Sequence, residues 1–410
     1  MDAFNENSNE QQAQQPMGCL HRFSKTIKVV IIGLLILLLM IPMFMIENLI
    51  SERGRTQKEA IDEVSEKWSL AQTITGPYLN LQYPVVTENN GEKKVSIKDL
   101  ILFPDELMVN GQLKTEILKR SIYEVNVYQS ELTLKGSFSS EELKKSRIDM
   151  DQLQFDRAAI CLNLTDMRGI SEQISITLGD SVYIFEPGMD NRGIANTGVH
   201  AIANLSELKQ NKKLPYEIKI KLKGSQSLNF IPLGKTTRVD LKANWNTPSF
   251  TGNYLPNNRN ITEKEFSAQW QVLNLNRNYS QVMVDYNTSN IKDIENSSFG
   301  VNFKIPVEQY QQSMRSAKYA ILIILLTFGV IFFTEIMNKT RIHALQYLLV
   351  GLALCLFYSL ILSFSEHIGF NPAYLLSSAL TIILVGGYMF GITKKKKPSL
   401  IMSGLLGILY

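Results

Sequence analysis

The polar stretch between residues 47 and 318 contains few side chains that could perform acid–base or nucleophilic chemistry. His200 is its only histidine, so a Ser-His-Asp or Cys-His site in this stretch would have to use it. The residues around it, 197–200, match no nucleophile motif, and the chain has no GxSxG pattern. We therefore interpret His200 as a histidine at the surface or satisfied within a loop, and we predict no catalytic residue.

Phosphate, metal and cofactor motifs are equally scarce. Residues 234–237 (GKTT) end like a phosphate-binding loop, but Asn229 replaces the first glycine and a strand is expected to follow in place of a helix. CxxC and HExxH patterns are absent. The three cysteines, Cys19, Cys161 and Cys355, lie in regions too different to form a disulfide framework. We predict no metal and no cofactor.

Four titratable residues beside apolar runs are the remaining candidates for function. Glu335 precedes Lys339 by four residues, the spacing of a helical ion pair, and His343 follows among interfacial residues. Glu366 and His367 share a short predicted loop, where such a pair could sense pH or gate a passage. The plainer interpretations are an interfacial pair and a solvated turn. No apolar run carries a charge at its midpoint, which argues against a proton pump or an ion-coupled transporter.

Long uncharged runs place these candidates at the ends of membrane helices. The run from residue 29 to 46, with its flanks, reaches the roughly 20 residues that cross about 30 Å of hydrocarbon. It lacks a signal-peptide cleavage site, so we predict an uncleaved anchor. The predicted order is a disordered tail (1–25), a first span (26–46), a polar domain (47–318), further spans (319–337, 345–364, 372–392) and a last apolar run (399–410). This last run is too short to cross the membrane, so we expect the chain to continue.

Basic residues give the spans a direction, because positive charge in short segments stays in the cytoplasm. Arg22, Lys25 and Lys28 precede the first span, Lys339 and Arg341 follow the second, and four lysines at 394–397 follow the fourth. All three clusters agree with a cytoplasmic N-terminus and an external domain at 47–318. The formal net charge of +4 does not indicate a nucleic-acid partner. The expected partners are the lipid bilayer and an envelope protein or lipid.

Period-two alternation dominates the polar domain and predicts half-buried antiparallel strands. It is seen in residues 174–178, 217–223, 239–245, 266–272, 282–286 and 299–305. Helices are expected only at 56–68, as a continuation of the first span that Gly54 could interrupt, at 306–318, and after a capping box at Ser139 and Glu142. The predicted fold class is an α-helical membrane bundle with a large, mainly-β, sandwich-like domain inserted between its first and second spans.

Several ordered strings resemble the CreD family of bacterial inner-membrane proteins. In the domain they are PLGKTT (232–237), Trp245, PSFTG (248–252), LP (255–256), FSAQW (266–270) and FGV (299–301). Toward the C-terminus they are PV (306–307), KY (318–319), TF (327–328), QYLLVGLAL (346–354), LFY (356–358) and SEHIGF (365–370). The resemblance covers roughly residues 20–410. It implies an inner-membrane protein for cell-envelope integrity with a periplasmic domain, and it implies no catalytic residues.

Three hypotheses for function follow. The first is a non-enzymatic envelope protein whose periplasmic domain binds a partner. The second is a transporter or lipid flippase, with the domain handling its substrate and Glu366 and His367 at one mouth. The third, which the sequence favours least, is a membrane-anchored hydrolase that uses His200.

Overall fold

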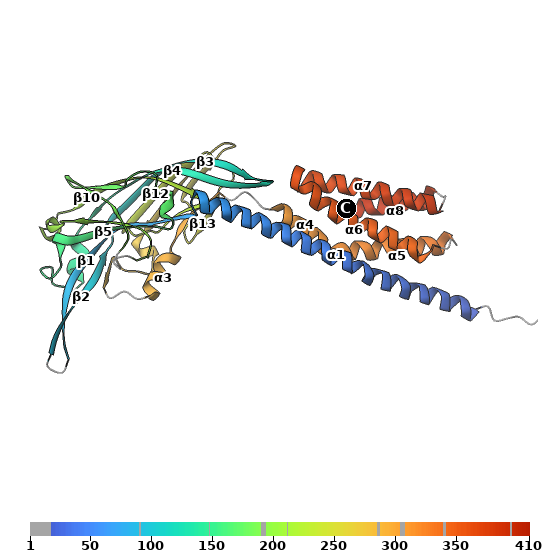
Figure 1. Ribbon diagram of the computed structural model, residues 1–410, viewed down its shortest axis with the longest axis horizontal. Coiled ribbons are helices and arrows are strands. Elements are labelled where there is room, and N and C mark those ends of the chain that lie inside the picture. The colour runs from blue at the N-terminus through green and yellow to red at the C-terminus, as the bar shows by residue number, and fades with distance from the viewer. Residues whose placement is uncertain are drawn as a thin grey trace, which may run out of the picture. The chain divides into compact units, whose positions relative to one another are not determined.

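The chain forms two compact units, residues 1–56 with 307–410 and residues 57–306. The computed structural model describes residues 18–89, 92–146, 148–189, 194–210, 212–284, 288–303, 308–338, 342–393 and 396–410. The first unit is helical and the second is mainly β (Figure 1). The helices of the first unit are α1 (Gly18–Trp68), whose end belongs to the second unit, α4 (Glu308–Lys318), α5 (Ala320–Asn338), α6 (Ala344–Ile368), α7 (Phe370–Thr393) and α8 (Lys396–Leu409).

Four helices in the described part of the chain are long and apolar enough to cross a membrane, which confirms the predicted membrane bundle. They cover Thr26–Trp68, Ala320–Met337, Ala344–Ile368 and Phe370–Ile392, with a shorter apolar helix at Ser399–Leu409. Two predicted boundaries were wrong. Helix α1 already begins at Gly18, inside the expected tail; past Gly54 it continues the first span, as expected. The expected loop around Glu366 shrinks to Gly369, whose positive φ ends α6.

Helix α1 packs in the bundle through one narrow face. Leu35, Leu39 and Met43, spaced four residues apart, are buried, while most other apolar side chains of this span are exposed, as suits a surface facing lipid. Leu39 lies against Gly351 of α6, where a β-carbon would collide with its methyl groups and approach the Phe328 ring to 3.0 Å. A glycine therefore lets the helices approach closely.

Seventeen strands in the described residues form two sheets. The nine-stranded sheet has the order β13-β17-β11-β1-β5-β9-β8, with β2 on β1 and β16 on β2. Its strands are β1 (Gln72–Asn89), β2 (Glu92–Leu102), β5 (Ala158–Leu164), β8 (Glu186–Pro187), β9 (Val199–Ala203), β11 (Ser227–Phe230), β13 (Ser249–Gly252), β16 (Val282–Val284) and β17 (Phe299–Asn302).

The eight-stranded sheet has the order β14-β15-β12-β3-β4-β10-β6-β7. Its strands are β3 (Glu106–Arg120), β4 (Tyr123–Phe138), β6 (Ser175–Leu178), β7 (Ser181–Ile184), β10 (Leu214–Ser225), β12 (Thr236–Ala243), β14 (Asn258–Ile261) and β15 (Phe266–Leu273). The pairing is antiparallel except for β1 with β11 and β3 with β12, which are parallel, so the antiparallel expectation was wrong for one side of β12.

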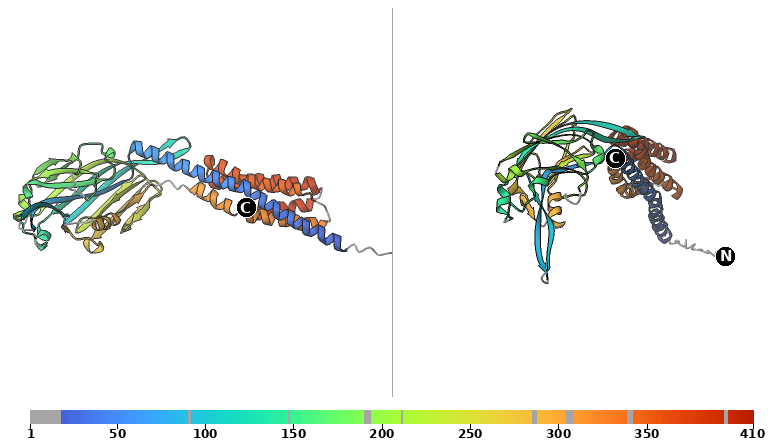
Figure 2. Two further views of the ribbon diagram at one scale, coloured as in Figure 1. Left: turned by 60° about the horizontal axis from the view of Figure 1, so that its bottom comes forward. Right: turned by 60° about the vertical axis from the view of Figure 1, so that its left-hand side comes forward.

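The two sheets pack face to face around one core (Figure 2). Aromatic side chains cross from one sheet to the other: Trp270 of β15 lies 5.8 Å from Phe299 of β17, measured between ring centroids. Helix α3 (Thr288–Asn296), which the sequence did not predict, adds Ile294 to a second core cluster that includes Phe103 and Cys161. The β1–β2 hairpin projects from the domain.

The alternation predicted for β10, β12 and β15 is confirmed by their burial patterns. Trp245 falls beyond the end of β12. Tyr286 and Ile305, the last positions of two predicted strands, lie outside the described residues, as do positions 306 and 307 at the start of the predicted helix before α5. The predicted capping box was wrong. Helix α2 (Glu141–Lys145) has Ser140 and not Ser139 at its N-cap, the Ser140 side chain makes no capping hydrogen bond to the helix, and the Glu142 carboxylate pairs with Lys145 and Lys235.

Candidate functional site

Glu335 is the centre of a buried polar cluster near the end of α5. Its carboxylate is ion-paired with the Lys28 ammonium of α1 and accepts hydrogen bonds from the Tyr347 hydroxyl at 3.1 Å and the Ile342 backbone N–H at 3.3 Å. The Lys28 ammonium also donates to the Ile342 carbonyl at 2.8 Å. The cluster thus joins α1, α5 and α6 through one carboxylate. The expected partner Lys339 lies outside the described residues.

His343 caps α6 beside this cluster. The His343 Nδ1 accepts a hydrogen bond from the Leu345 backbone N–H at 3.2 Å. The His343 backbone N–H donates to the Gln346 side-chain oxygen at 3.0 Å. Such a reciprocal arrangement satisfies backbone groups that the first helical turn would otherwise leave unpaired. The geometry therefore supports a structural role for His343.

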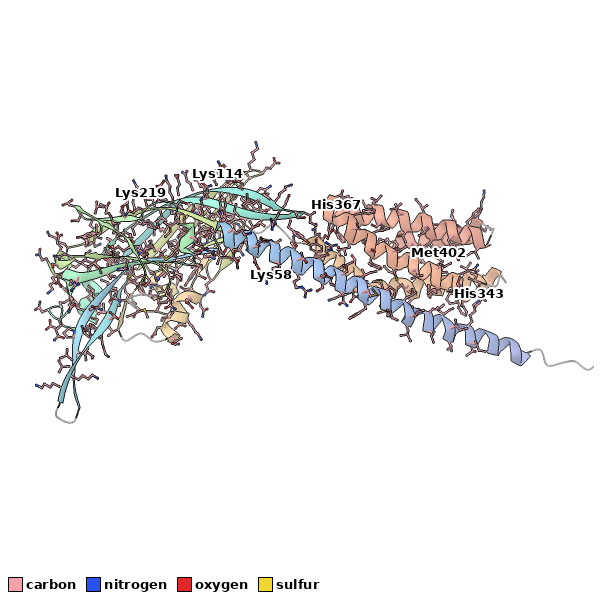
Figure 3. All side chains as sticks on the ribbon, in the orientation of Figure 1. Lys58, Lys114, Lys219, His343, His367 and Met402 are labelled. Carbon is pink, nitrogen blue, oxygen red and sulfur yellow. The ribbon has the colours of Figure 1, made fainter. Side chains whose placement is uncertain are left out.

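Glu366 and His367 occupy the last turn of α6, so His343 and His367 mark its two ends (Figure 3). Glu366 accepts a hydrogen bond from the Tyr310 hydroxyl of α4 at 2.9 Å, and Arg53 of α1 lies 3.9 Å from the same oxygen. His367 is exposed. Tyr347, which binds Glu335, and Glu366 are 19 residues apart on α6, a rise of roughly 28 Å, so the two carboxylates are too far apart to act in one site.

His200 lies on a strand of the nine-stranded sheet, next to the edge strand β8. It is on β9 opposite Cys161 of β5, only 7 % exposed, and its Nδ1 is 2.7 Å from the Gly188 carbonyl oxygen. Residues 234–237 lead into β12, and the Lys235 ammonium is held by Asp105 at 3.4 Å and Glu142 at 2.9 Å. Both features therefore fit structural roles. Among the described residues, no group of three or more His, Cys, Asp or Glu side chains is arranged to hold a metal.

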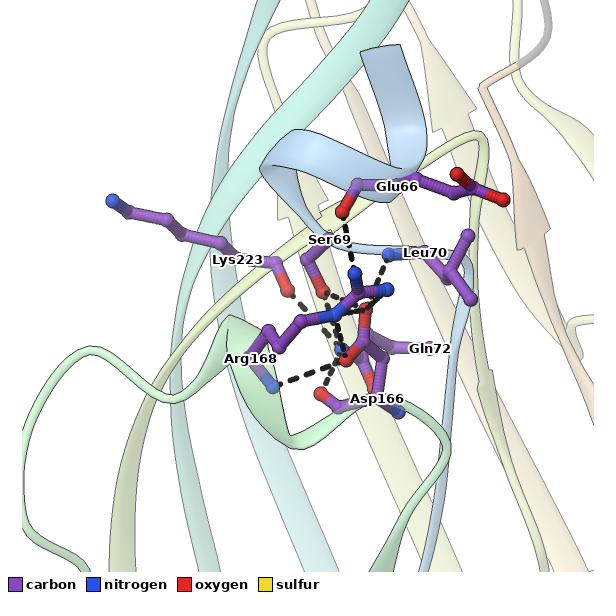
Figure 4. Close-up of polar contacts among 7 residues, drawn as sticks. All are labelled: Glu66, Ser69, Leu70, Gln72, Asp166, Arg168 and Lys223. Carbon is purple, nitrogen blue, oxygen red and sulfur yellow. Dashed lines mark hydrogen bonds and ion pairs between the residues drawn. The ribbon is translucent and has the colours of Figure 1, made fainter. Parts of the chain in front are cut away.

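The most densely bonded polar group of the β unit is Asp166, which sequence reasoning missed (Figure 4). Its carboxylate accepts hydrogen bonds from the Leu70 N–H at 2.9 Å, the Ser69 hydroxyl at 3.3 Å, and the backbone and guanidinium of Arg168 at 2.9–3.2 Å. Its backbone exchanges two further bonds with the Gln72 side chain. Asp166 therefore holds the segment that follows α1 against the loop that follows β5.

Arg168 connects this cluster to the end of α1. Its Nη1 donates to the Glu66 carbonyl at 2.7 Å, one of the last carbonyls of the helix, where a cation also complements the helix dipole. Burial alone would raise the pKa of Asp166, but the hydrogen bonds from Arg168 and Leu70 outweigh it and lower the pKa to about 2. At neutral pH the Asp166 side chain is therefore a carboxylate that holds its hydrogen-bond donors in place, and not a proton donor.

Arg277 is a buried cation without a carboxylate partner among the described residues. The guanidinium carbon lies 4.5 Å from the Tyr279 ring centroid and 5.8 Å from that of Phe103, and Nη2 donates to Gln281. Nε and Nη1 have no acceptor in the described part of the chain, and burial lowers the pKa of the guanidinium. The ring contacts offset only part of this desolvation.

Replacing Arg277 by methionine should therefore leave the β unit as stable as before or stabilise it by about 1 kcal/mol, because the replacement removes a poorly compensated buried charge. The three tryptophans, Trp68, Trp245 and Trp270, all lie in this unit, so their emission during urea unfolding of the full-length protein measures the change. Arg259→Met, at an exposed position of β14, is the control. A loss above about 2 kcal/mol would show that the charge is compensated in the native state.

Comparison with known proteins gives one consistent result. The family model described as "Inner membrane protein CreD" matches residues 24–410. A curated protein of Escherichia coli (strain K12), "Inner membrane protein CreD", is 32% identical over 366 residues, which cover 88% of this chain and 79% of that protein.

Proposed function

Since the chain belongs to the CreD family of inner membrane proteins, we propose that it is a non-enzymatic protein that supports cell-envelope integrity or the response to envelope stress. In this proposal the β domain binds an envelope partner, a protein or a lipid, and the helices relay that contact to the membrane. The N-terminus faces the cytoplasm and residues 47–318 face the periplasm, as the three basic clusters at residues 22–28, 339–341 and 394–397 favour.

The observation that carries the proposal is the construction of α1. This single helix of 51 residues includes a membrane span at one end and is fastened to the β domain at the other by Asp166 and Arg168. A protein that only needed an anchor could use a flexible linker after its span. A continuous helix with a hydrogen-bonded end is the element expected where a contact made by the domain must act on the span.

The alternatives find less support in the geometry. A transporter that used Glu366 would need this carboxylate free to exchange partners, yet it accepts a hydrogen bond from Tyr310. A hydrolase that used His200 would need the imidazole open to substrate, yet it lies buried on β9 beside the Gly188 carbonyl. Both placements favour structural roles for these side chains.

A pair of insertions after Thr56 tests the relay. Seven residues of Gly and Ser should abolish protection of a deletion strain against membrane-perturbing detergent, because they interrupt α1. Seven helix-forming residues should preserve it, because two turns keep the angular phase of the helix to within about 20°. Immunoblotting and tryptophan emission would establish that both proteins are made and that their β domains fold. Full protection by the Gly-Ser protein would contradict the relay. It would show that the β domain acts without a continuous helix to the membrane span.

A further inference from the structure

A groove of about 510 Å³ lies between α1 and α4. Its lining is predominantly apolar, and one basic side chain stands at its edge. The residues that shape it are Ile50, Ser51 and Gly54 of α1 and Tyr310, Met314 and Arg315 of α4. A β-carbon placed at Gly54 would stand 3.8 Å from that of Tyr310, an ordinary van der Waals contact, so a larger side chain can be introduced here.

The depth of the groove follows from helix geometry. The uncharged run of α1 ends at Ile46, so Ile50 and Gly54 lie about 6 Å and 12 Å beyond it along the helix. The polar layer of a bilayer extends roughly 5–8 Å beyond the hydrocarbon on each side. Arg315 precedes the apolar run of α5, which begins at Ala320, by five residues. The groove therefore begins at the level of the lipid phosphates and extends outward from it, beyond the end of the hydrocarbon.

The charges around the groove match an anionic occupant. Arg315 is exposed and has no acidic partner within ion-pair distance among the described residues. Arg53, which precedes Gly54 on α1, is 48% exposed. Its Nε lies 3.9 Å from a carboxylate oxygen of Glu366, close to the longest distance of an ion pair. Both arginines lie in the long external segment, Arg53 near its start and Arg315 near its end. Basic residues in such a long segment have little influence on the orientation of the membrane spans. A guanidinium with free donors is suited to bidentate contact with a phosphate.

We propose that this groove binds the head-group end of one anionic phospholipid from the leaflet on the β-domain side, with its phosphate at Arg315 and its glycerol region against Ile50 and Met314. An apolar floor beneath a cation is the pattern that one amphiphile satisfies at both ends. A second helix in the groove would cover the apolar floor but leave the guanidinium unpaired. The proposal requires the membrane spans but not the relay function.

Native mass spectrometry of the full-length protein from detergent micelles provides the test. Delipidated protein is titrated with palmitoyl-oleoyl phosphatidylglycerol or, separately, with the zwitterionic phosphatidylcholine of the same chains. We expect one phosphatidylglycerol per chain, bound at least five times more tightly than phosphatidylcholine. Arg315→Gln should reduce this preference below twofold. Lys318→Gln, an exposed neighbour on α4 that does not line the groove, should leave it unchanged.

A second variant separates lipid loss from misfolding. In Gly54→Leu a side chain enters the groove from a helical position, where leucine is a better helix former than glycine, so binding should fall at least tenfold while the thermal midpoint is maintained. Equal retention of the two lipids by the wild type, or an unchanged preference in Arg315→Gln, would overturn the proposal. So would a disulfide-linked dimer formed through Met314→Cys, because a second copy would then occupy the groove.

Discussion

Replacing Asp166 by alanine is expected to lower the free energy of unfolding of the β domain by about 3 kcal/mol, or to lower its thermal midpoint by roughly 10 °C. The substitution leaves the Leu70 N–H, the Ser69 hydroxyl and the Arg168 side chain without the acceptor that all three share. Each orphaned donor costs about 1–3 kcal/mol, although Arg168 recovers part of the loss by turning to solvent. Tryptophan emission during urea unfolding of the full-length protein measures the effect.

Asp166 also makes stability depend on pH. Its pKa falls from an ordinary 3.8 to about 2 on folding, so its contribution is fully present above pH 4 and is lost as the pH falls toward 2. This part amounts to about 1–2 kcal/mol after allowance for solvent screening. Asp166→Asn should therefore show a flatter stability profile between pH 4 and 2 than the wild type.

Asp151→Ala is a matched control, because this carboxylate is 89% exposed and lies 3.6 Å from the Lys209 ammonium. It should change stability by less than about 0.5 kcal/mol. If Asp166→Ala cost no more than this control, the cluster would not be what fastens the end of α1 to the domain.

Period-two alternation identified several strands that have one face in the core and one in solvent, such as β10, β12 and β15, but β3, whose burial also alternates, was not predicted. It missed β1 and β5 for a physical reason. The seven residues of β5 are all buried, because one face of the strand meets the core between the sheets and the other meets the cluster around Phe103 and Ile294. A strand covered on both faces has no polar side to alternate with.

The candidate site residues show the limit of reasoning from spacing. Glu335 was matched to Lys339 because four residues separate neighbours on one helix face, yet in the structure it is bonded to Lys28, 307 residues away. Asp166 gave no signal at all, since its partners Ser69 to Gln72 are about 100 residues away and no local pattern marks them. Contacts made by folding alone are invisible to periodicity, whereas membrane spans, which depend on local composition, were predicted well.

Replacing Glu335 by alanine is expected to destabilise the helical bundle by about 3 kcal/mol, because Lys28, Tyr347 and the Ile342 N–H lose one shared acceptor at low dielectric. The tryptophans do not report on this unit, but Cys355 does, since it is buried on α6. In a Cys19→Ser, Cys161→Ala background, the rate at which maleimide labels Cys355 measures opening of the bundle. A loss of 3 kcal/mol should raise this rate roughly 150-fold.

A double substitution distinguishes charge from packing. Lys28→Met with Glu335→Leu removes both charges, and the replacement of a buried ion pair by apolar side chains of similar volume is often neutral or stabilising. The double variant should therefore label within about tenfold of the wild type, although each single variant is much faster. If it labels as fast as Glu335→Ala, the hydrogen bonds from Tyr347 and Ile342, and not the ion pair, make the larger contribution. A Glu335→Ala rate within threefold of the wild type would contradict any stabilising role for the cluster.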